Sequence, residues 1–167
     1  MECAVPWQRF EPSKCVLGQR QQNKRYPSAE YLGVSYKDSM VEMPAIQIVT
    51  PWLNKPAEYT LGESSELSWS ATDHAFFHKL KILHEQIRSF LLVNHRIKVN
   101  APSYALTVYL DKGRTAIKSS SASGATTMED ATKNSQQQYK LCIRLAGIHL
   151  QHGCANYRFK CIGVLLR

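Results

Sequence analysis

The basic side chains of this chain are concentrated near its end. Of the formal net charge of +8, the residues after Asp130 contribute +6, because they include six Lys and Arg and no Asp or Glu. In residues 139–146 and again in 157–162, apolar residues alternate with basic ones. A strand repeats its face every second residue, so each run predicts a strand with one apolar and one basic face. Such a basic face favours nucleic-acid binding, because phosphates need cations and bases need flat surfaces; a solvent-exposed sheet face is the alternative.

Basic and aromatic residues elsewhere extend this candidate interface. The polar loop GQRQQNKRYPS combines three cations with a tyrosine and is suited to holding a flexible strand, although a solvated hairpin tip has the same composition. Trp52 follows Pro51, which ends a strand because it cannot donate to a ladder, so this Trp is either a core residue or a stacking platform. The candidate nucleic-acid-binding residues are Arg20, Lys24, Arg25, Tyr26, Trp52, Tyr109, Lys112, Arg114, Lys140, Arg144, Arg158 and Lys160.

Metal binding and catalysis find little support in the sequence. His149, His152, Cys154 and Cys161 could ligate zinc, but their spacing matches no standard finger and the strand pattern accounts for two of them. The five cysteines are an odd number without a CxxC spacing, which indicates reduced thiols. The sequence has no Gly-rich phosphate loop, HExxH or GxSxG motif. We expect a binding protein rather than an enzyme, with no catalytic residues, no metal and no cofactor.

Length and composition are typical of one globular domain over residues 1–167. A chain of 167 residues with 44% hydrophobic content can bury a core. The sequence pI of about 9.3 favours a polyanionic partner, although an anionic membrane surface or an acidic protein is also compatible with it. No N-terminal signal-peptide pattern is present, and no run approaches the ~20 apolar residues of a membrane span. We therefore expect an intracellular protein with no membrane partner.

One helix and several strands must position these residues. The clearest helix is expected over residues 73–94, with Thr72 or Asp73 as N-cap. Its apolar stripe recurs at three- and four-residue steps and consists of Phe76, Leu80, Leu83, Ile87, Phe90 and Leu91. Strands are expected at 15–17, 31–36, 66–70, 104–110 and the start of 45–56, with 114–118 as a hairpin partner of 104–110. Residues 1–44 are expected to be a basic N-terminal hairpin and extension, and the Ser- and Thr-rich segment 119–137 a mobile loop.

This order of elements predicts the fold class. Several strands, one amphipathic helix, a hairpin and a final strand pair favour a mainly β protein with a helix inserted between strands. We expect a small β-barrel of the OB-fold type, which binds single strands across a basic, aromatic-bearing face.

Several stretches carry a resemblance to a known family. They are IQIVTPWLNKPAEYTL, the WS at Trp69, FFHKLKILHEQIRSFL and the closing runs YKLCIRLAGIHL and YRFKCIGVLL. Over residues 45–167 the chain thereby resembles the OB-fold single-stranded DNA-binding proteins of nucleocytoplasmic large DNA viruses. The resemblance implies that Thr50, Pro51 and Trp52 form the element after an early strand and that Lys140, Arg144, Arg158 and Lys160 lie on the closing pair. The chain departs from the pattern with AEY after Pro56, where the family tends to have a Phe-Gly pair, so the role of that turn is open.

The expected function combines the basic face with this resemblance. We expect a sequence-tolerant single-stranded DNA-binding protein that acts stoichiometrically in viral DNA replication, in the host nucleus or at a cytoplasmic replication site. RNA as the partner and assembly into a homo-oligomer are left open. The alternative is a structural, virion or scaffold interaction module without nucleic-acid binding. In that case Trp7, Trp52 and Tyr109 would cluster with Val164 and Leu166 in an exposed apolar patch.

Overall fold

A computed structural model of the chain describes residues 4–22, 24–25, 28–111, 113–121 and 124–167. Strands make up 42% of it and helices 19%, which confirms the expectation of a mainly β protein. The strands form two sheets, and the long helix α1 lies between strands in the chain order. Buried residues of both sheets and of α1 belong to one hydrophobic core.

The larger of the two sheets, the large sheet, has the strand order β1-β5-β10-β13-β8-β7-β6, with β9 also paired to β13. Its strands are β1 Val5–Pro6, β5 Ile46–Val49, β6 Glu58–Thr60, β7 Ser64–Trp69, β8 Leu106–Asp111, β9 Ala116–Ser119, β10 Tyr139–Leu145 and β13 Phe159–Leu166. The small sheet has the order β12-β11-β3-β2, with β4 paired to β3. Its strands are β2 Cys15–Gln22, β3 Glu30–Lys37, β4 Glu42–Met43, β11 Gly147–Gln151 and β12 Cys154–Asn156.

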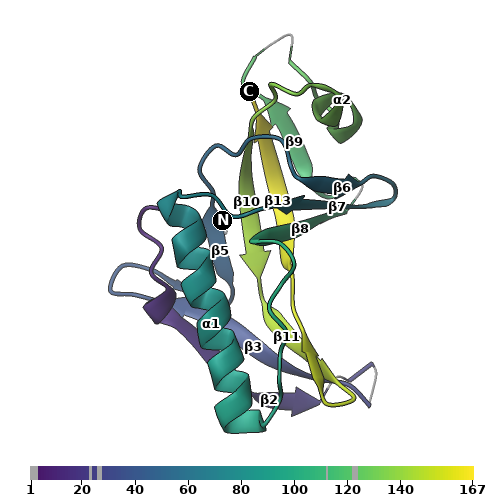
Figure 1. The fold of residues 1–167 in the computed structure, drawn as a ribbon. Helices are drawn as coiled ribbons and strands as arrows, with labels where there is room; N and C mark the ends of the chain where they lie inside the picture. Colours follow the sequence, from purple (N-terminus) through teal and green to yellow (C-terminus); the bar gives the residue numbers. More distant parts are fainter. Residues whose placement is uncertain (1–3, 23, 26–27, 112, 122–123) are drawn as a thin grey trace.

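The two sheets share one long strand and do not close into a ring. β10 ends at Leu145 and β11 begins at Gly147, so a nearly continuous strand passes from the large sheet above to the small sheet below (Figure 1). Among the described residues, the main path of the large sheet ends at β1 and β6, that of the small sheet ends at β2 and β12, and no closed barrel is found. The barrel expected from the sequence is therefore not observed.

The closing strand pair has the two-faced character that its sequence predicts. β10 and β13 pair antiparallel, and along β10 each buried residue is followed by a half-buried one. The register shifts where Cys142 faces Gly163 and Ile143 faces Cys161, so Ile162 is an extra residue on β13. An extra residue shifts the alternation of the following side chains by one position, so even-numbered residues after the bulge face the core. As a result Val164 is buried like Cys161, although the two differ in strand parity.

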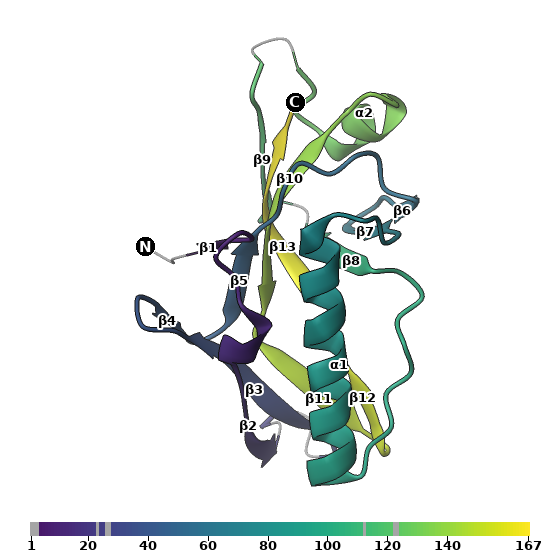
Figure 2. The same cartoon turned by 60° about the vertical axis from the view of Figure 1, so that its left-hand side comes forward.

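The helix α1 (Ala75–His95) packs lengthwise beside both sheets (Figure 1 and Figure 2). Its buried residues are Phe76, Phe77, Leu80, Leu83, Ile87 and Leu91. All of them except Phe77 belong to the expected stripe, and Phe90, the remaining member of that stripe, is half-buried. The expected N-cap is wrong: His74 caps the helix, because its Nδ1 accepts the Phe76 N–H at 3.1 Å. Thr72 instead accepts the His74 N–H at 3.2 Å. No helix among the described residues has the length and apolar character needed to cross a bilayer.

β2 and β3 pair antiparallel and form the expected N-terminal hairpin, but β2 extends to Gln22, so the first part of the run GQRQQNKRYPS is strand and not loop. The hairpin is also part of the core rather than an appended extension. Leu32, Val34 and Tyr36 of β3 are fully buried, and β3 pairs with β11 on its other edge.

Two other expectations from the sequence are wrong. β9 does not pair with β8: both edges of β8 are occupied, by β7 and β13, so β9 lies parallel to the second half of β13. The segment 119–137, expected as a loop, contains β9's last residue, Ser119, and the helix α2 (Met128–Lys133). Thr127 caps α2 by accepting the Asp130 N–H, and Met128 and Ala131 are buried in the core.

Candidate nucleic-acid interface

A row of polar side chains crosses the large sheet on the face opposite the core. In the strand register, Arg144 of β10 is the partner of Lys160 of β13. Lys160 is the partner of Tyr109 of β8, and Tyr109 is the partner of Glu66 of β7. Neighbouring strands are about 4.8 Å apart. Four consecutive strands therefore bring two cations, a tyrosine ring and a carboxylate into one line.

This row borders a cavity of about 290 Å³, which we name the sheet groove. Its walls include Tyr109, Arg144, Tyr157, Arg158 and Lys160. Three of the four cations expected on the closing strand pair thus lie together, and they are joined by two tyrosine rings.

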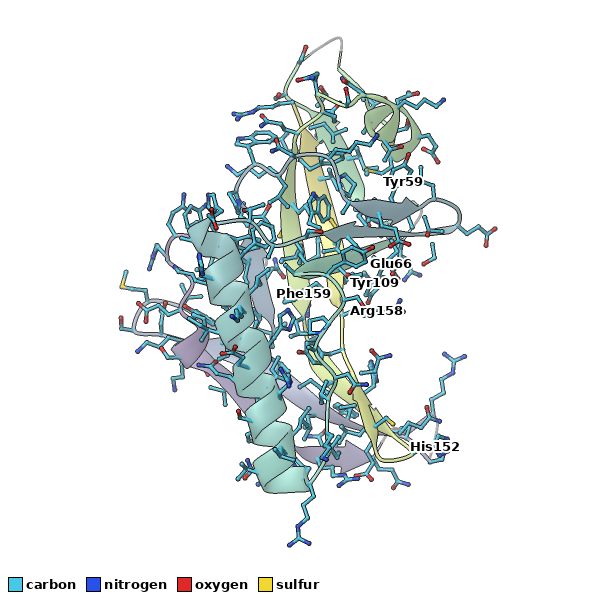
Figure 3. All side chains as sticks on the ribbon, viewed as in Figure 1. Tyr59, Glu66, Tyr109, His152, Arg158 and Phe159 are labelled. Carbon is cyan, nitrogen blue, oxygen red and sulfur yellow. The ribbon has the colours of Figure 1, made fainter. Side chains whose placement is uncertain are left out.

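Arg158 lies just before β13 and projects onto Tyr109. Its guanidinium carbon is 4.6 Å from the centroid of the Tyr109 ring, and its Nη1 is 3.6 Å from a carboxylate oxygen of Glu66. Figure 3 shows Glu66, Tyr109 and Arg158 close together on the sheet, with His152 far away at the tip of the β11–β12 hairpin. The Arg158 side chain is still 56% exposed, so the guanidinium remains accessible to a ligand.

The groove has acidic neighbours, which corrects the expectation of a basic face without them. Besides the contact between Glu66 and Arg158, the Nζ of Lys160 lies 3.2 Å from a carboxylate oxygen of Asp111. Both acids come from β7 and β8, which are distant in sequence from the closing pair. Ion pairs this exposed are worth about 0–1 kcal/mol. A phosphate could therefore replace either carboxylate at small cost.

Trp52 forms a second cluster of rings and cations, which we name the Trp52 cluster. The Nζ of Lys140 lies 5.6 Å from its ring centroid, and the guanidinium carbon of Arg167 lies 4.3 Å from it. Arg167 is held in place by a 2.8 Å hydrogen bond from its Nε to Oε1 of Gln138. Lys140 and Arg144 lie on the same face of β10, and four residues of strand span about 13 Å. The two clusters therefore share one face of the large sheet.

The other candidate residues are not brought to this face. Arg20 of β2 pairs with Glu30 of β3 at 2.7 Å, and Lys24 and Arg25 lie at the exposed end of that hairpin. Arg114 is exposed after β8 and does not line the sheet groove. Tyr26 and Lys112 lie outside the described residues.

Tyr157 connects the sheet groove to α1. Its hydroxyl oxygen lies 2.8 Å from Nδ1 of His84, and the two ring centroids are 5.6 Å apart. Burial raises the pKa of Tyr157 to about 12 and lowers the pKa of His84. Both side chains are therefore neutral at pH 7. The hydrogen bond to His84 fixes Tyr157, the residue that precedes Arg158, from the side of the core.

Sequence reasoning missed several residues of the site. Glu66 and Asp111 enter through strand pairing between distant segments, for which the sequence carries no local signal. By strand alternation Tyr157 belongs to the apolar face of the run 157–162, and Arg167 is one of the six cations after Asp130 with no pattern around it. That Lys140 and Arg167 lie beside Trp52 follows from the bridge between Leu53 and Tyr139, for which the sequence carries no local signal.

The apolar patch of the alternative interpretation is not formed. Val164 and Leu166 are buried in the core. Trp7 packs against the core edge, with its ring centroid 4.7 Å from that of His74. Trp52 and Tyr109 are each covered in part by cations rather than by apolar side chains.

Comparison with known proteins adds no assignment to this geometry. In the described part of the chain no three His, Cys, Asp or Glu side chains form a group that could hold a metal ion. No family model, curated protein or solved structure matches the chain.

Proposed function

We propose that this protein binds single-stranded DNA stoichiometrically and with little sequence preference, in DNA replication. The observation that carries the proposal is the sheet groove, where Arg144, Arg158 and Lys160 lie beside the Tyr109 ring. Cations that track a backbone, combined with rings on which bases stack, are the combination that sequence-tolerant binders of single strands use. The resemblance to viral OB-fold single-stranded DNA-binding proteins supports the same function.

In this proposal the cations neutralise phosphates and the rings hold bases. Arg158 covers one face of Tyr109, so a base can stack on the guanidinium plane or displace it from the ring. Trp52 offers a second stacking position beside Lys140, which lies about 13 Å along β10 from Arg144. Each stack is worth ~1–3 kcal/mol. Glu66 marks the border of the path, because its carboxylate repels the backbone from the β7 side.

The OB-fold assignment belongs to this proposal too. The OB fold is itself a partly open barrel with an inserted helix. A strand shared between two sheets, and a helix between strands in the chain order, support treating this fold as a distant variant of that plan.

Salt dependence is the first test. Five cations lie in the two clusters: Lys140, Arg144, Arg158, Lys160 and Arg167. If each neutralises one phosphate of a single strand, log affinity falls with log salt at a slope near −3.5, at ~0.7 per phosphate. Fluorescence anisotropy with labelled oligo-dT measures this slope, and oligo-U and duplex DNA measured in parallel show which nucleic acid is preferred. A flat salt response, or no binding at low salt, would refute the proposal.

The second test removes the cations from the groove. We expect Arg144→Ala together with Arg158→Ala to make the slope less steep, from about −3.5 to about −2.1, since two phosphate contacts are lost. The affinity at about 0.1 M salt should fall by about 25-fold. The matched control is Lys14→Ala with Lys133→Ala, because both lysines are exposed and neither lines the groove. Thermal unfolding of both variants checks that they fold. Binding unchanged in the Arg variant, or reduced equally in the control, would remove the closing strands from the site.

A further inference from the structure

A hollow larger than the sheet groove lies between α1 and the segment that follows it. Residues 96–105, here named the strap, run back beside α1 to the start of β8 (Figure 2). The cavity between them, which we name the helix cavity, has a volume of about 490 Å³. Phe77, Pro102 and Tyr104 supply apolar and aromatic wall, and cavities of this size and lining are typical of ligand sites.

One face of α1 supplies the charges of the helix cavity. Phe77, Lys81, His84 and Arg88 follow one another at steps of four, three and four residues, so they lie on the same side of the helix. Lys81 and Arg88 are exposed, and Glu85 is the acid that faces the same cavity. The formal charge of this wall is therefore positive, and its aromatic and apolar parts lie next to its cations.

The strap contacts this face of α1 at two points. The Nε of Arg88 donates to the carbonyl oxygen of Val99 at 3.2 Å. Near the other end of the strap, Ala105 lines the helix cavity together with His84.

A third cavity joins the helix cavity to the sheet groove. It has a volume of about 290 Å³ and shares the wall residues His84, Pro102 and Tyr104 with the helix cavity. It also shares Tyr157 and Arg158 with the sheet groove. The three hollows thus adjoin one another through shared walls, in a series from the large sheet to α1 that we name the band.

The joining cavity adds a cation to this band. Lys98 of the strap lines it and is exposed. The sheet groove supplies Arg144, Arg158 and Lys160, the joining cavity adds Lys98, and the helix cavity supplies Lys81 and Arg88 beside the acid Glu85. Tyr109, Tyr157 and Tyr104 lie between these cations. A repeated alternation of cations and rings along a band suits a flexible polyanion that carries flat groups.

We propose that a bound single strand does not end at the sheet groove but crosses the strap at Lys98 and enters the helix cavity, where Lys81 holds its backbone. This inference rests on the proposed function and extends it, because it assigns a second subsite to α1 and the strap. The subsite adds phosphate contacts that only a strand long enough to reach past Arg158 can make.

The test compares two lengths of labelled oligo-dT, about 6 and about 16 nucleotides, which bracket the site sizes of OB-type binders. The variant is Lys81→Ala with Lys98→Ala. Both side chains are exposed, so we expect the variant to fold as the unaltered protein does. We expect the longer oligonucleotide to bind about 25-fold more weakly to this variant at about 0.1 M salt. The slope of log affinity against log salt should be less steep by about 1.4, while binding of the shorter oligonucleotide is unchanged. The control variant Lys14→Ala with Lys133→Ala should bind both lengths as the unaltered protein does.

Three results would overturn the inference. The first is equal affinity of the lysine variant and the unaltered protein for the longer oligonucleotide. The second is a loss of the same size for both lengths or in the control variant, which would indicate a general charge effect. The third is no binding of either length by the unaltered protein, which would refute the proposed function as well. In the first two cases binding to the sheet groove stands and only the path over α1 is refuted.

Discussion

Thr50 provides a sharp test of how the large sheet is held together at the point where β5 ends. Its side chain is fully buried. The Thr50 N–H donates to the Leu141 carbonyl at 2.9 Å, and the Thr50 hydroxyl oxygen accepts the Leu141 N–H at 2.9 Å. The hydroxyl itself donates to the Pro51 carbonyl at 2.8 Å. The side chain thus replaces a backbone partner that β10 loses where the chain turns at Pro51.

Replacement of Thr50 by Val keeps the shape of the side chain and leaves the Leu141 N–H buried without an acceptor. An unsatisfied buried donor costs about 1–3 kcal/mol. For a chain of this length a loss of 1 kcal/mol lowers Tm by about 2–4 °C, so we expect a decrease of about 2 to 12 °C. Urea denaturation and thermal unfolding followed by circular dichroism measure the free energy of unfolding and Tm.

Tyr139 supplies the matched control, since it is also fully buried and its hydroxyl has no hydrogen-bond partner among the described residues. Replacement of Tyr139 by Phe removes a buried hydroxyl without breaking a bond, so the free energy of unfolding should stay the same or rise by about 1 kcal/mol. The reasoning is refuted if Thr50→Val is as stable as the unaltered protein, or if Tyr139→Phe loses as much stability as Thr50→Val.

Two further predictions concern titratable groups. Burial lowers the pKa of His84 from its usual 6.5, so just below pH 6.5 the unfolded chain binds a proton that the folded chain does not, and stability falls as the pH decreases. The drop in Tm between about pH 7.5 and about pH 5.5 should therefore be smaller for His84→Gln than for the unaltered protein, and an equal drop would contradict this assignment. Burial also raises the pKa of Cys15 and of Cys161 to about 12, whereas Cys154 is exposed. Iodoacetamide at about pH 8 should thus alkylate Cys154 well before the other two in the folded protein, and peptide mass spectrometry would reveal the opposite order if it occurred.

Local patterns predicted the elements of the fold well where one face of an element is buried. The alternation in β10 and the stripe of α1 were both correct, because burial against the core imposes the period directly on the sequence. The sequence also carries a helix-start signal for α2, because Thr127 stands three residues before Asp130; the expectation of a loop rested on composition alone and did not use it. The N-cap of α1 was missed because His74 takes a role that Thr or Asp usually fills.

Pairing between distant segments could not be predicted. That β9 runs parallel to β13 depends on which edges β8 leaves available, and only the complete sheet decides this. The same limit applies to the site. Arg144, Arg158 and Lys160 were identified from the chain, but the carboxylates of Glu66 and Asp111 beside them follow from the order of strands. The pattern of charges along the chain therefore predicted the cations of the site, but it predicted a more positive site than the structure has.

The strand shared by both sheets determines which partner adapts when a ligand binds. β10 and β11 are hydrogen-bonded to neighbours on both edges, and the sheet groove includes Arg144, Ala146 and Gly147, where this strand crosses between the sheets. A backbone that is hydrogen-bonded on both sides resists bending, so the groove is preorganised. Little of the free energy of binding is therefore needed to order the protein. A flexible polymer bound there would have to take the curvature of the protein, and its entropy loss, rather than any rearrangement of the sheets, would limit the affinity.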